Sequence, residues 1–262
     1  MNATPKFYVD GERIDGKLPL DGLEDAIRAA VRTATALSGS PAAGPRGRYA
    51  GMALVNNPLF ARWFARYGGR NEERGNREYR QEMLAGLSGR VLEVGPGSGL
   101  NFPHYPASVQ EVVAVEPEPY LRARAAEAAA TAPVPITVVD GAADQVPAPD
   151  GSFDAAVACA LLCSVDDAAA ALAEFHRVLR PGGELRFYEH VRSRDILFAS
   201  YQQAADLLWP RLMGGCHTQR DTRAAIERLF AIETIRGFRF PADSLIWPVA
   251  PRILGIARKP AA

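Results

Sequence analysis

From about residue 90 onward, the chain of 262 residues alternates between short apolar runs and longer amphipathic stretches. The apolar runs are typical of buried β-strands and lie at 90–94, 111–116, 135–139, 153–158 and 184–189. The alanine-rich stretches 120–130 and 168–179 predict helices between them, and Asp166 and Asp167 are N-cap candidates for the second. Further strands are expected over 232–238 and 252–257. This alternation predicts a mostly parallel sheet that is covered by helices on both faces.

The first 50 residues follow a different pattern and are interpreted as an extension. Apolar residues between Leu20 and Leu37 recur at helical spacing, and Asp21 with Glu24 resembles a capping box. A single amphipathic helix is therefore expected over about 21–37, followed by a Gly- and Pro-rich linker at 38–45. The main domain would then span 51–262. It would begin with a helical region at 57–86, whose run of arginine and glutamate indicates a solvated helix face.

Charge and cysteine content narrow the class of protein. The formal net charge is zero and the pI is near 6.9, which disfavours a polyanionic partner such as nucleic acid. The three cysteines, Cys159, Cys163 and Cys216, favour a reducing compartment over a disulfide framework. The polar N-terminus lacks the apolar core of a signal peptide, and no window is apolar enough to span a membrane. We therefore expect a cytoplasmic protein, and the composition rich in alanine and arginine is typical of a GC-rich bacterial genome.

A glycine-rich turn follows the strand at 90–94 and precedes a helical segment. Gly95, Gly97 and Gly99 lack side chains, so the backbone can approach a ligand and adopt positive φ. Glu93, directly before the turn, is placed to order it or to reach the amino end of a cofactor. A dinucleotide fingerprint would require Gly or Ala where Leu100 stands, and no P-loop motif is present.

An acidic residue ends the next strand. Glu116 lies at the position where a carboxylate accepts hydrogen bonds from ribose hydroxyls, and Pro117 stops the strand behind it. The two signals together indicate a nucleoside-containing cofactor.

The ordered motifs resemble those of the class I S-adenosylmethionine (SAM)-dependent methyltransferases, in the methyltransferase type 11 group. They are Val91–Gly99, Glu116-Pro117, Pro149–Asp154 and Arg177–Gly183. The resemblance implies a Rossmann-like α/β fold with seven strands, one of them antiparallel. It also implies SAM as cofactor, S-adenosylhomocysteine as product, and these cofactor-binding residues: Tyr67, Glu93, Gly95, Pro96, Gly97, Gly99, Asn101, Glu116, Pro117, Ala142, Ala143, Asp144, Cys159 and Ala160.

The adenine segment departs from this group, because Ala142 stands where an acidic residue is usual. The backbone of Ala143 remains available to the adenine ring, and Asp144 or Asp140 is the candidate for the polar contact.

A closer resemblance is to the mammalian membrane-associated thiol methyltransferases. The segments that carry it are Asn101–Pro106, Leu162–Val165, Tyr188–Val191, Gly215-Cys216 with Thr218, and Pro251–Ala257. Those relatives have an apolar N-terminal anchor, whereas this chain has a polar extension, so membrane association is not carried over.

Candidate catalytic residues end the fifth strand of the domain. Ligands of open α/β sheets bind at the carboxyl ends of the strands, where Glu189-His190 and Cys163-Ser164 both fall. We expect His190 to be the general base or to orient the acceptor, with Glu189 beside it; the alternative is a hydrogen-bonded histidine without a chemical role. No metal site is expected, because Cys159/Cys163 and Cys216-His217 lack a paired C-x-x-C motif.

The expected partner is a small-molecule methyl acceptor, and a homodimer is compatible with the sequence. An aromatic and aliphatic set suits an apolar acceptor or core packing: Tyr201, Leu207, Leu208, Trp209, Phe238, Phe240 and Trp247. S-methylation of a thiol is one hypothesis, and O-, N- or C-methylation in secondary-metabolite or quinone-like biosynthesis is another. A SAM-binding regulator without catalysis is a third.

Overall fold

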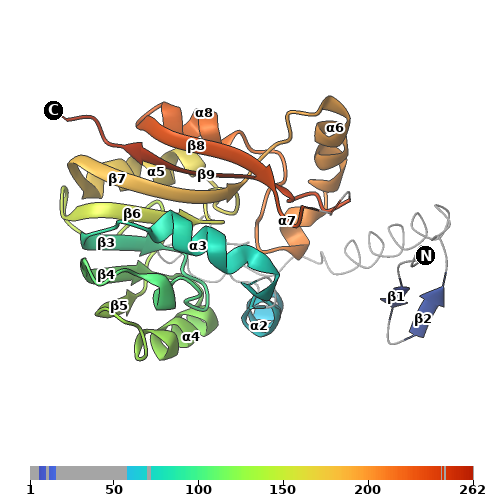
Figure 1. Ribbon diagram of the computed structural model, residues 1–262, viewed down its shortest axis with the longest axis horizontal. Helices are drawn as coiled ribbons and strands as arrows, with labels where there is room; N and C mark the ends of the chain where they lie inside the picture. The colour runs from blue at the N-terminus through green and yellow to red at the C-terminus, as the bar shows by residue number, and fades with distance from the viewer. Residues whose placement is uncertain are drawn as a thin grey trace, which may run out of the picture. The chain divides into compact units, whose positions relative to one another are not determined.

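The computed structural model describes residues 6–9, 12–15, 58–69, 72–242, 244 and 246–261 (Figure 1). The chain divides into two compact units, Met1–Ala50 and Gly51–Ala262. In the first, β1 (Lys6–Val9) pairs antiparallel with β2 (Glu12–Asp15), a hairpin that the sequence analysis missed. The intervening Asp10-Gly11 is a dipeptide typical of such connections. The expected helix over 21–37 and the linker at 38–45 lie outside the described residues.

The second unit is built on a seven-stranded sheet with the order β5-β4-β3-β6-β7-β9-β8 (Figure 1). Neighbouring strands are parallel except at β9, which runs antiparallel to both β7 and β8. The predicted fold, with one antiparallel strand, is therefore confirmed. The strands are β3 (Gly89–Val94), β4 (Val109–Val115), β5 (Ile136–Val139), β6 (Phe153–Cys159), β7 (Leu179–His190), β8 (Ala231–Arg239) and β9 (Pro251–Arg258).

Helices cover both faces of this sheet, as expected. Successive side chains of a strand point to opposite faces, and β6 divides its residues between two hydrophobic cores accordingly. Ala156 and Ala158 belong to the core shared with α5 (Ala168–Val178) and α8 (Thr222–Glu227). Ala155 and Val157 belong to the core shared with α3 (Arg77–Leu84) and α4 (Pro119–Ala129).

The remaining helices are short and surround the carboxyl edge of the sheet. They are α2 (Pro58–Tyr67), the π-helical turn Glu72–Asn76, the 3₁₀ turn Phe102–His104, α6 (Ile196–Ala205) and α7 (Trp209–Leu212). Acidic side chains cap the N-termini of several helices, and Asp167 accepts hydrogen bonds from two N–H groups of α5, as its position predicted. Among the described residues, no helix is long and apolar enough to cross a membrane.

The strand order reverses between β3 and β6, the place where open α/β sheets bind ligands. The segments after β3, β4, β6 and β7 meet at this edge, which brings the glycine turn, Glu116, Cys159 and His190 to one side of the molecule.

Candidate functional site

The glycine turn after β3 has a backbone that side chains would disrupt. Gly95, Gly97 and Gly99 have φ of 67°, 59° and 82°. A Cβ at Gly95 would lie 2.7 Å from Cδ1 of Leu161, and one at Gly97 would lie 2.8 Å from Cε1 of Phe64. The turn is thus packed between α2 and the loop after β6, and Pro96 is buried within it. Glycine is required at these positions both for backbone conformation and for space.

Glu116 is tied to the glycine turn by its own side chain. Its Oε2 accepts a 3.0 Å hydrogen bond from the N–H of Gly97, and Oε1 accepts one from the N–H of Glu118. The carboxyl group is buried, and this burial raises its pKa to about 7. Arg122 donates to the carbonyl oxygens of Glu116 and Pro117, which holds the tip of β4 in place. A carboxylate at this tip, beside a glycine cradle, suits the ribose of a nucleoside.

Glu93 lies under the segment that follows the turn. It is buried, and it accepts hydrogen bonds from Asn101 Nδ2 at 2.8 Å and from the Tyr105 hydroxyl at 2.7 Å. Burial raises the pKa of Glu93, while the two donors act in the opposite direction. Glu93 therefore orders the residues after the glycine turn, which is one of the two roles that its sequence position suggested.

Arg80 of α3 completes this network, and the sequence analysis missed it. Its Nη1 donates to Asn101 Oδ1 at 2.7 Å and to Cys159 Sγ at 3.1 Å, and its Nε donates to Glu72. The side chains of Arg80 and Glu72 are only 12% and 10% exposed, so the interpretation of this charged stretch as a solvated face is wrong for these two residues. Helical spacing was the available signal, because Arg80 lies on the same face as the buried Met83 and Leu84.

The residues expected to contact adenine follow β5 (Ile136–Val139). Ala142 is buried, Ala143 is half-buried and Asp144 is exposed, while Asp140 pairs with Arg122 at 2.9 Å. Tyr67 ends α2, and its side chain lies outside the described residues.

Glu189 holds the loop that follows β6. Its carboxylate accepts three hydrogen bonds from backbone N–H groups, those of Leu161 and Leu162 at 2.9 Å and that of Cys163 at 3.1 Å. This loop begins at Ala160, a non-glycine residue with a φ of 53°. Burial raises the pKa of Glu189 well above its ordinary value, against the effect of the three donors.

The position of Glu189 corrects the expectation that its side chain lies beside His190. Adjacent residues of a strand point to opposite faces, and Glu189 accordingly accepts from the N–H of Cys163 while His190 lies beside its sulfur. Glu189 acts on the loop, whereas His190 faces the side chains that the loop carries.

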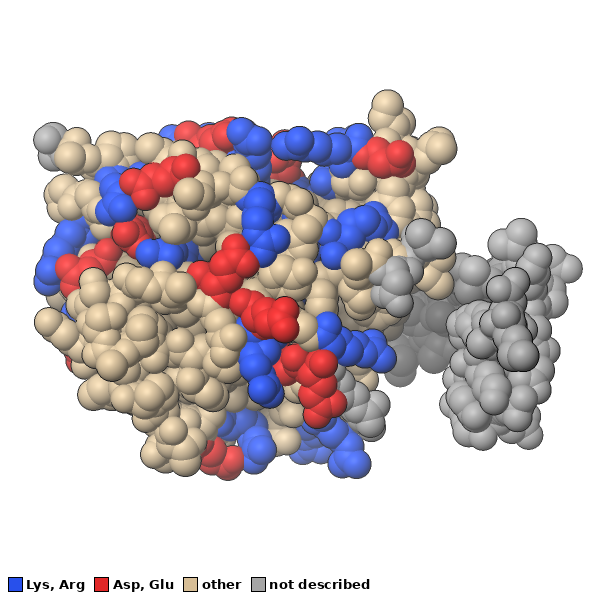
Figure 2. Space-filling view, in the orientation of Figure 1, with Lys and Arg blue, Asp and Glu red and all other residues tan. Residues whose placement is uncertain are grey.

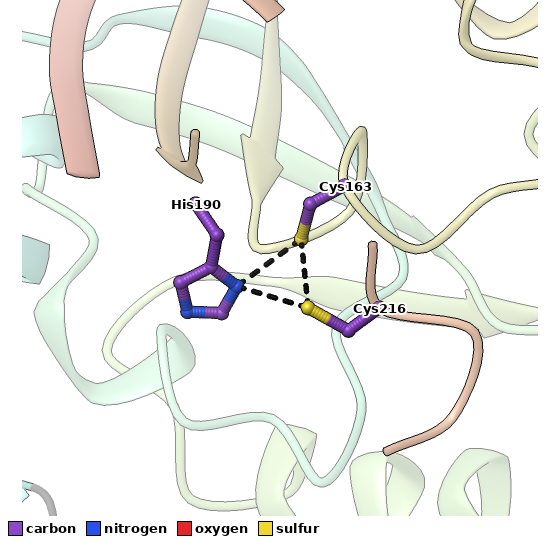
Figure 3. A group of neighbouring side chains, drawn as sticks. All are labelled: Cys163, His190 and Cys216. Carbon is purple, nitrogen blue, oxygen red and sulfur yellow. Dashed lines mark hydrogen bonds between the residues drawn. The ribbon is translucent and has the colours of Figure 1, made fainter. Parts of the chain in front are cut away.

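His190 lies with two thiols in a compact group, which we call the Cys-His cluster: Cys163, His190 and Cys216 (Figure 3). Nδ1 of His190 lies 3.2 Å from Cys163 Sγ and 3.3 Å from Cys216 Sγ, and the sulfur atoms are 3.6 Å apart. Both cysteines are buried and His190 is half-buried. Burial raises the pKa of the Cys163 thiol to about 12.

The sequence analysis considered Cys159/Cys163 and Cys216-His217 and expected no metal site, but the residues that meet in the structure are a different set. Cys159 contacts Arg80, and His217 Nδ1 lies 2.9 Å from Asp206, so neither joins the Cys-His cluster. Cys216 follows α7 and comes next to Cys163 because the N–H of His217 donates to the Cys163 carbonyl at 2.7 Å. No local motif links residues 53 positions apart, which is why sequence reasoning did not find this group.

Of the seven expected acceptor-pocket residues, Tyr201 and Leu207 are exposed and Leu208 is half-buried, and the other four form two groups. Phe238 stacks on Tyr79 with ring centroids 4.4 Å apart and Phe240 is buried, so both belong to the packed core. Trp209 packs against Cys163 and Cys216, and its ring meets that of Trp247 edge-on at 5.0 Å. Trp209 therefore puts an apolar wall beside the Cys-His cluster, and the exposed Trp247 packs against Trp209.

Comparison with known proteins connects this geometry to a family. A family described as a methyltransferase domain matches residues 92–187. The human thiol S-methyltransferase TMT1B is 36% identical over 183 residues, which cover 67% of this chain and 74% of that protein. The human thiol S-methyltransferase TMT1A is 35% identical over 187 residues, which cover 68% and 75%.

Solved structures show the same fold at low sequence identity. The N-methyltransferase NodS from Bradyrhizobium japonicum, in complex with S-adenosyl-L-homocysteine, superposes with a TM-score of 0.55 at 17% identity. The match covers 72% of this chain and 87% of NodS.

Proposed function

Because this chain belongs to the SAM-dependent methyltransferases of the methyltransferase type 11 group, we propose that it methylates the sulfur of a small-molecule thiol. The observation that carries the proposal is the Cys-His cluster close to the glycine turn. Leu161, which packs against Gly95, is two residues from Cys163, so the two parts of the site share one loop. The thiol S-methyltransferases at about 35% identity support the same acceptor atom.

The residues around the glycine turn fit SAM. Glu116 offers a buried carboxylate for the ribose hydroxyls, and it accepts from the N–H of Gly97 in a turn whose glycines have positive φ. Arg80 and Asn101 would hold the methionine end, where a guanidinium can pair with the cofactor's carboxylate. The backbone of Ala142 and Ala143 would contact the adenine ring. When bound, SAM supplies a methyl group on a positively charged sulfur, so its leaving group is already activated.

The protein's remaining task is to align the acceptor and exclude water. The new sulfur–carbon bond forms as the methyl–sulfonium bond breaks, and the thiol proton passes to solvent. Since a free thiol has a pKa near 8.5, a few per cent is ionised at neutral pH without a strong base. We therefore assign to His190 the orientation of the acceptor, with Trp209 as the apolar wall.

The chemistry is tested with a panel of small thiols, phenols and amines, by measuring S-adenosylhomocysteine formation with SAM in excess. We expect turnover with apolar thiols. Turnover of a phenol or amine without any thiol activity would instead support O- or N-methylation. Binding of SAM without transfer to any acceptor would support a regulator.

We further propose a small-molecule acceptor in preference to nucleic acid. Lys and Arg are interspersed with Asp and Glu on the face seen in Figure 2, and the net charge is zero, so this face offers no basic stripe for phosphates. All three cysteines are free, which supports our proposal of a cytoplasmic, reducing location.

A further inference from the structure

We propose that Cys163, His190 and Cys216 form a binding site for one Zn²⁺ ion. Zinc binds thiolate sulfur at about 2.3 Å and imidazole nitrogen at about 2.0–2.1 Å in tetrahedral geometry. In that geometry two sulfur ligands lie about 3.8 Å apart, and a sulfur and a nitrogen lie about 3.6 Å apart. The observed separations are 3.6 Å between the sulfurs and 3.2 and 3.3 Å from sulfur to Nδ1.

The convergence of both thiols on one nitrogen favours a metal over hydrogen bonding. A neutral imidazole nitrogen has a single lone pair, or carries a single N–H, so Nδ1 satisfies one sulfur at a time. The second thiol is then left with the longer 3.6 Å contact in which Cys216 Sγ donates to Cys163 Sγ. A cation within the triangle is bound by all three atoms together (Figure 3). Two sulfurs with an imidazole are a soft donor set, which favours Zn²⁺ over Mg²⁺ or Ca²⁺.

The three ligands are held by separate parts of the fold. Glu189 and His217 hydrogen-bond to the backbone N–H and carbonyl of Cys163. Cys216 follows Gly215, where a Cβ would lie only 2.6 Å from the carbonyl oxygen of Ser164. Only glycine permits this approach, so the loops that carry the two cysteines pack directly on each other. His190 ends β7 opposite Arg252 of β9.

Three protein ligands leave a fourth position open, which is typical of catalytic zinc sites; structural sites use four. His190 is the half-buried member of the Cys-His cluster, and Trp209 packs on the group that holds both cysteines. Resting on the proposed thiol methylation, we infer that the fourth position takes the acceptor sulfur as a thiolate. Its proton is released to solvent on binding, and the sulfur retains a lone pair for attack on the methyl carbon.

Metal binding is tested on the full chain, reduced and stripped with a chelator, without SAM or acceptor. Titration with Zn²⁺ and elemental analysis should show one ion per chain. Co²⁺ should give the tetrahedral bands and the thiolate-to-metal charge-transfer absorption of a two-sulfur site. Absence of uptake, or binding without the charge-transfer band, would overturn the site.

Variants assign the ligands. We expect Cys163→Ser, Cys216→Ser and His190→Gln each to weaken metal binding by more than the roughly 10- to 100-fold typical of losing a supporting contact. Cys159→Ser is the matched control and should retain the metal affinity, because Cys159 lies outside the Cys-His cluster. His190 is half-buried, so His190→Gln remains informative if a cysteine variant fails to fold, as judged by circular dichroism. Wild-type affinity in His190→Gln would refute the assignment.

A final experiment tests whether the acceptor binds the metal, and it distinguishes failure of this inference from failure of the proposed function. Adding an apolar thiol to the Co²⁺ protein should shift the charge-transfer band, and an unchanged band would exclude the acceptor from the fourth position. The metal titration uses no methyl transfer, so metal binding without thiol turnover would defeat the proposed function alone.

Discussion

The backbone N–H of Cys163 donates a 3.1 Å hydrogen bond to Oε2 of Glu189, a residue 26 positions later on the neighbouring strand. Because Oε1 accepts from Leu161 and Leu162, one carboxylate determines the path of the whole loop. The loop in turn contacts the glycine turn through Leu161 and carries Cys163 into the Cys-His cluster. Glu189 is thus a positioning residue.

We predict that Glu189→Gln destabilises the fold by about 1–3 kcal/mol, because the amide turns a donor toward an N–H group that needs an acceptor. Thermal unfolding measures the loss, and thiol turnover at saturating SAM should fall as the loop shifts. Glu233→Gln, on the exposed side of β8, is the control and should change unfolding little. Unchanged unfolding in Glu189→Gln would show that the loop does not depend on this carboxylate.

SAM affinity should depend on pH through Glu116. Burial raises the pKa of this carboxyl to about 7, so the group is protonated below that pH and accepts ribose hydrogen bonds poorly. If only the carboxylate binds, affinity falls about tenfold per pH unit below 7 and is constant above it. Calorimetric titration across this range measures the effect.

Glu116→Gln should bind SAM more weakly, and its SAM affinity should no longer change with pH near 7. Glu127→Gln, at an exposed position of α4, should keep this pH dependence. The same shift predicts that the free protein loses stability as pH rises from about 4.5 to about 7, since the folded state holds the proton more tightly than the unfolded state. If the pH dependence of SAM affinity persists in Glu116→Gln, it arises from another titratable group.

Arg80→Met should weaken SAM binding by about tenfold or more, because a charge-assisted hydrogen bond contributes about 1.5–3 kcal/mol. Arg80→Lys should restore only part of the affinity, since an ammonium lacks the planar fork that reaches Glu72 through Nε and Asn101 through Nη1. Arg77→Met, on the exposed face of α3, is the control. If calorimetry gives Arg80→Met the same SAM affinity as Arg77→Met, Arg80 does not contribute to the cofactor site.

Gly97→Ala and Gly151→Ala form a matched pair, because both residues have a φ of 59°. Each substitution should cost about 1–2 kcal/mol of stability from the left-handed backbone alone. Gly97→Ala should also lose SAM affinity, since its Cβ would meet Phe64 at 2.8 Å and displace the turn, while no described residue lies within 4 Å of a Cβ at Gly151. Equal SAM affinity in both variants would mean that the turn does not contact the cofactor.

His190→Ala should lower thiol turnover at saturating SAM and leave SAM affinity unchanged, because the histidine contacts the cysteines and not the glycine turn. His176→Ala, whose ring packs on Phe230, serves as the control for a histidine remote from the Cys-His cluster. Steady-state kinetics decide, and unaltered turnover would leave His190 as a strand-end residue without a chemical role.

The sheet was predictable because its information is local. Each buried strand is an apolar run. The three glycines of the turn at Gly95–Gly99 indicate positive φ, because glycine adopts that conformation more readily than other residues. It could also have been predicted from the sequence that Glu189 and His190 point to opposite faces, since the side chains of successive strand residues alternate. The approach of Cys216 to Cys163 could not be predicted in this way. The two residues are 53 positions apart, and their contact depends on how the segment after α7 packs on the loop after β6.

Strand β9 has a consequence for how the protein is made. It lies between β7 and β8, yet both neighbours leave the ribosome before it. Within the seven-stranded sheet β8 pairs with β9 alone, so in a nascent chain that has emerged through β8 one edge of β7 and the whole of β8 still lack their partner. Since chains are synthesised from the N-terminus, the sheet closes only when Pro251–Arg258 has been translated and inserted between them.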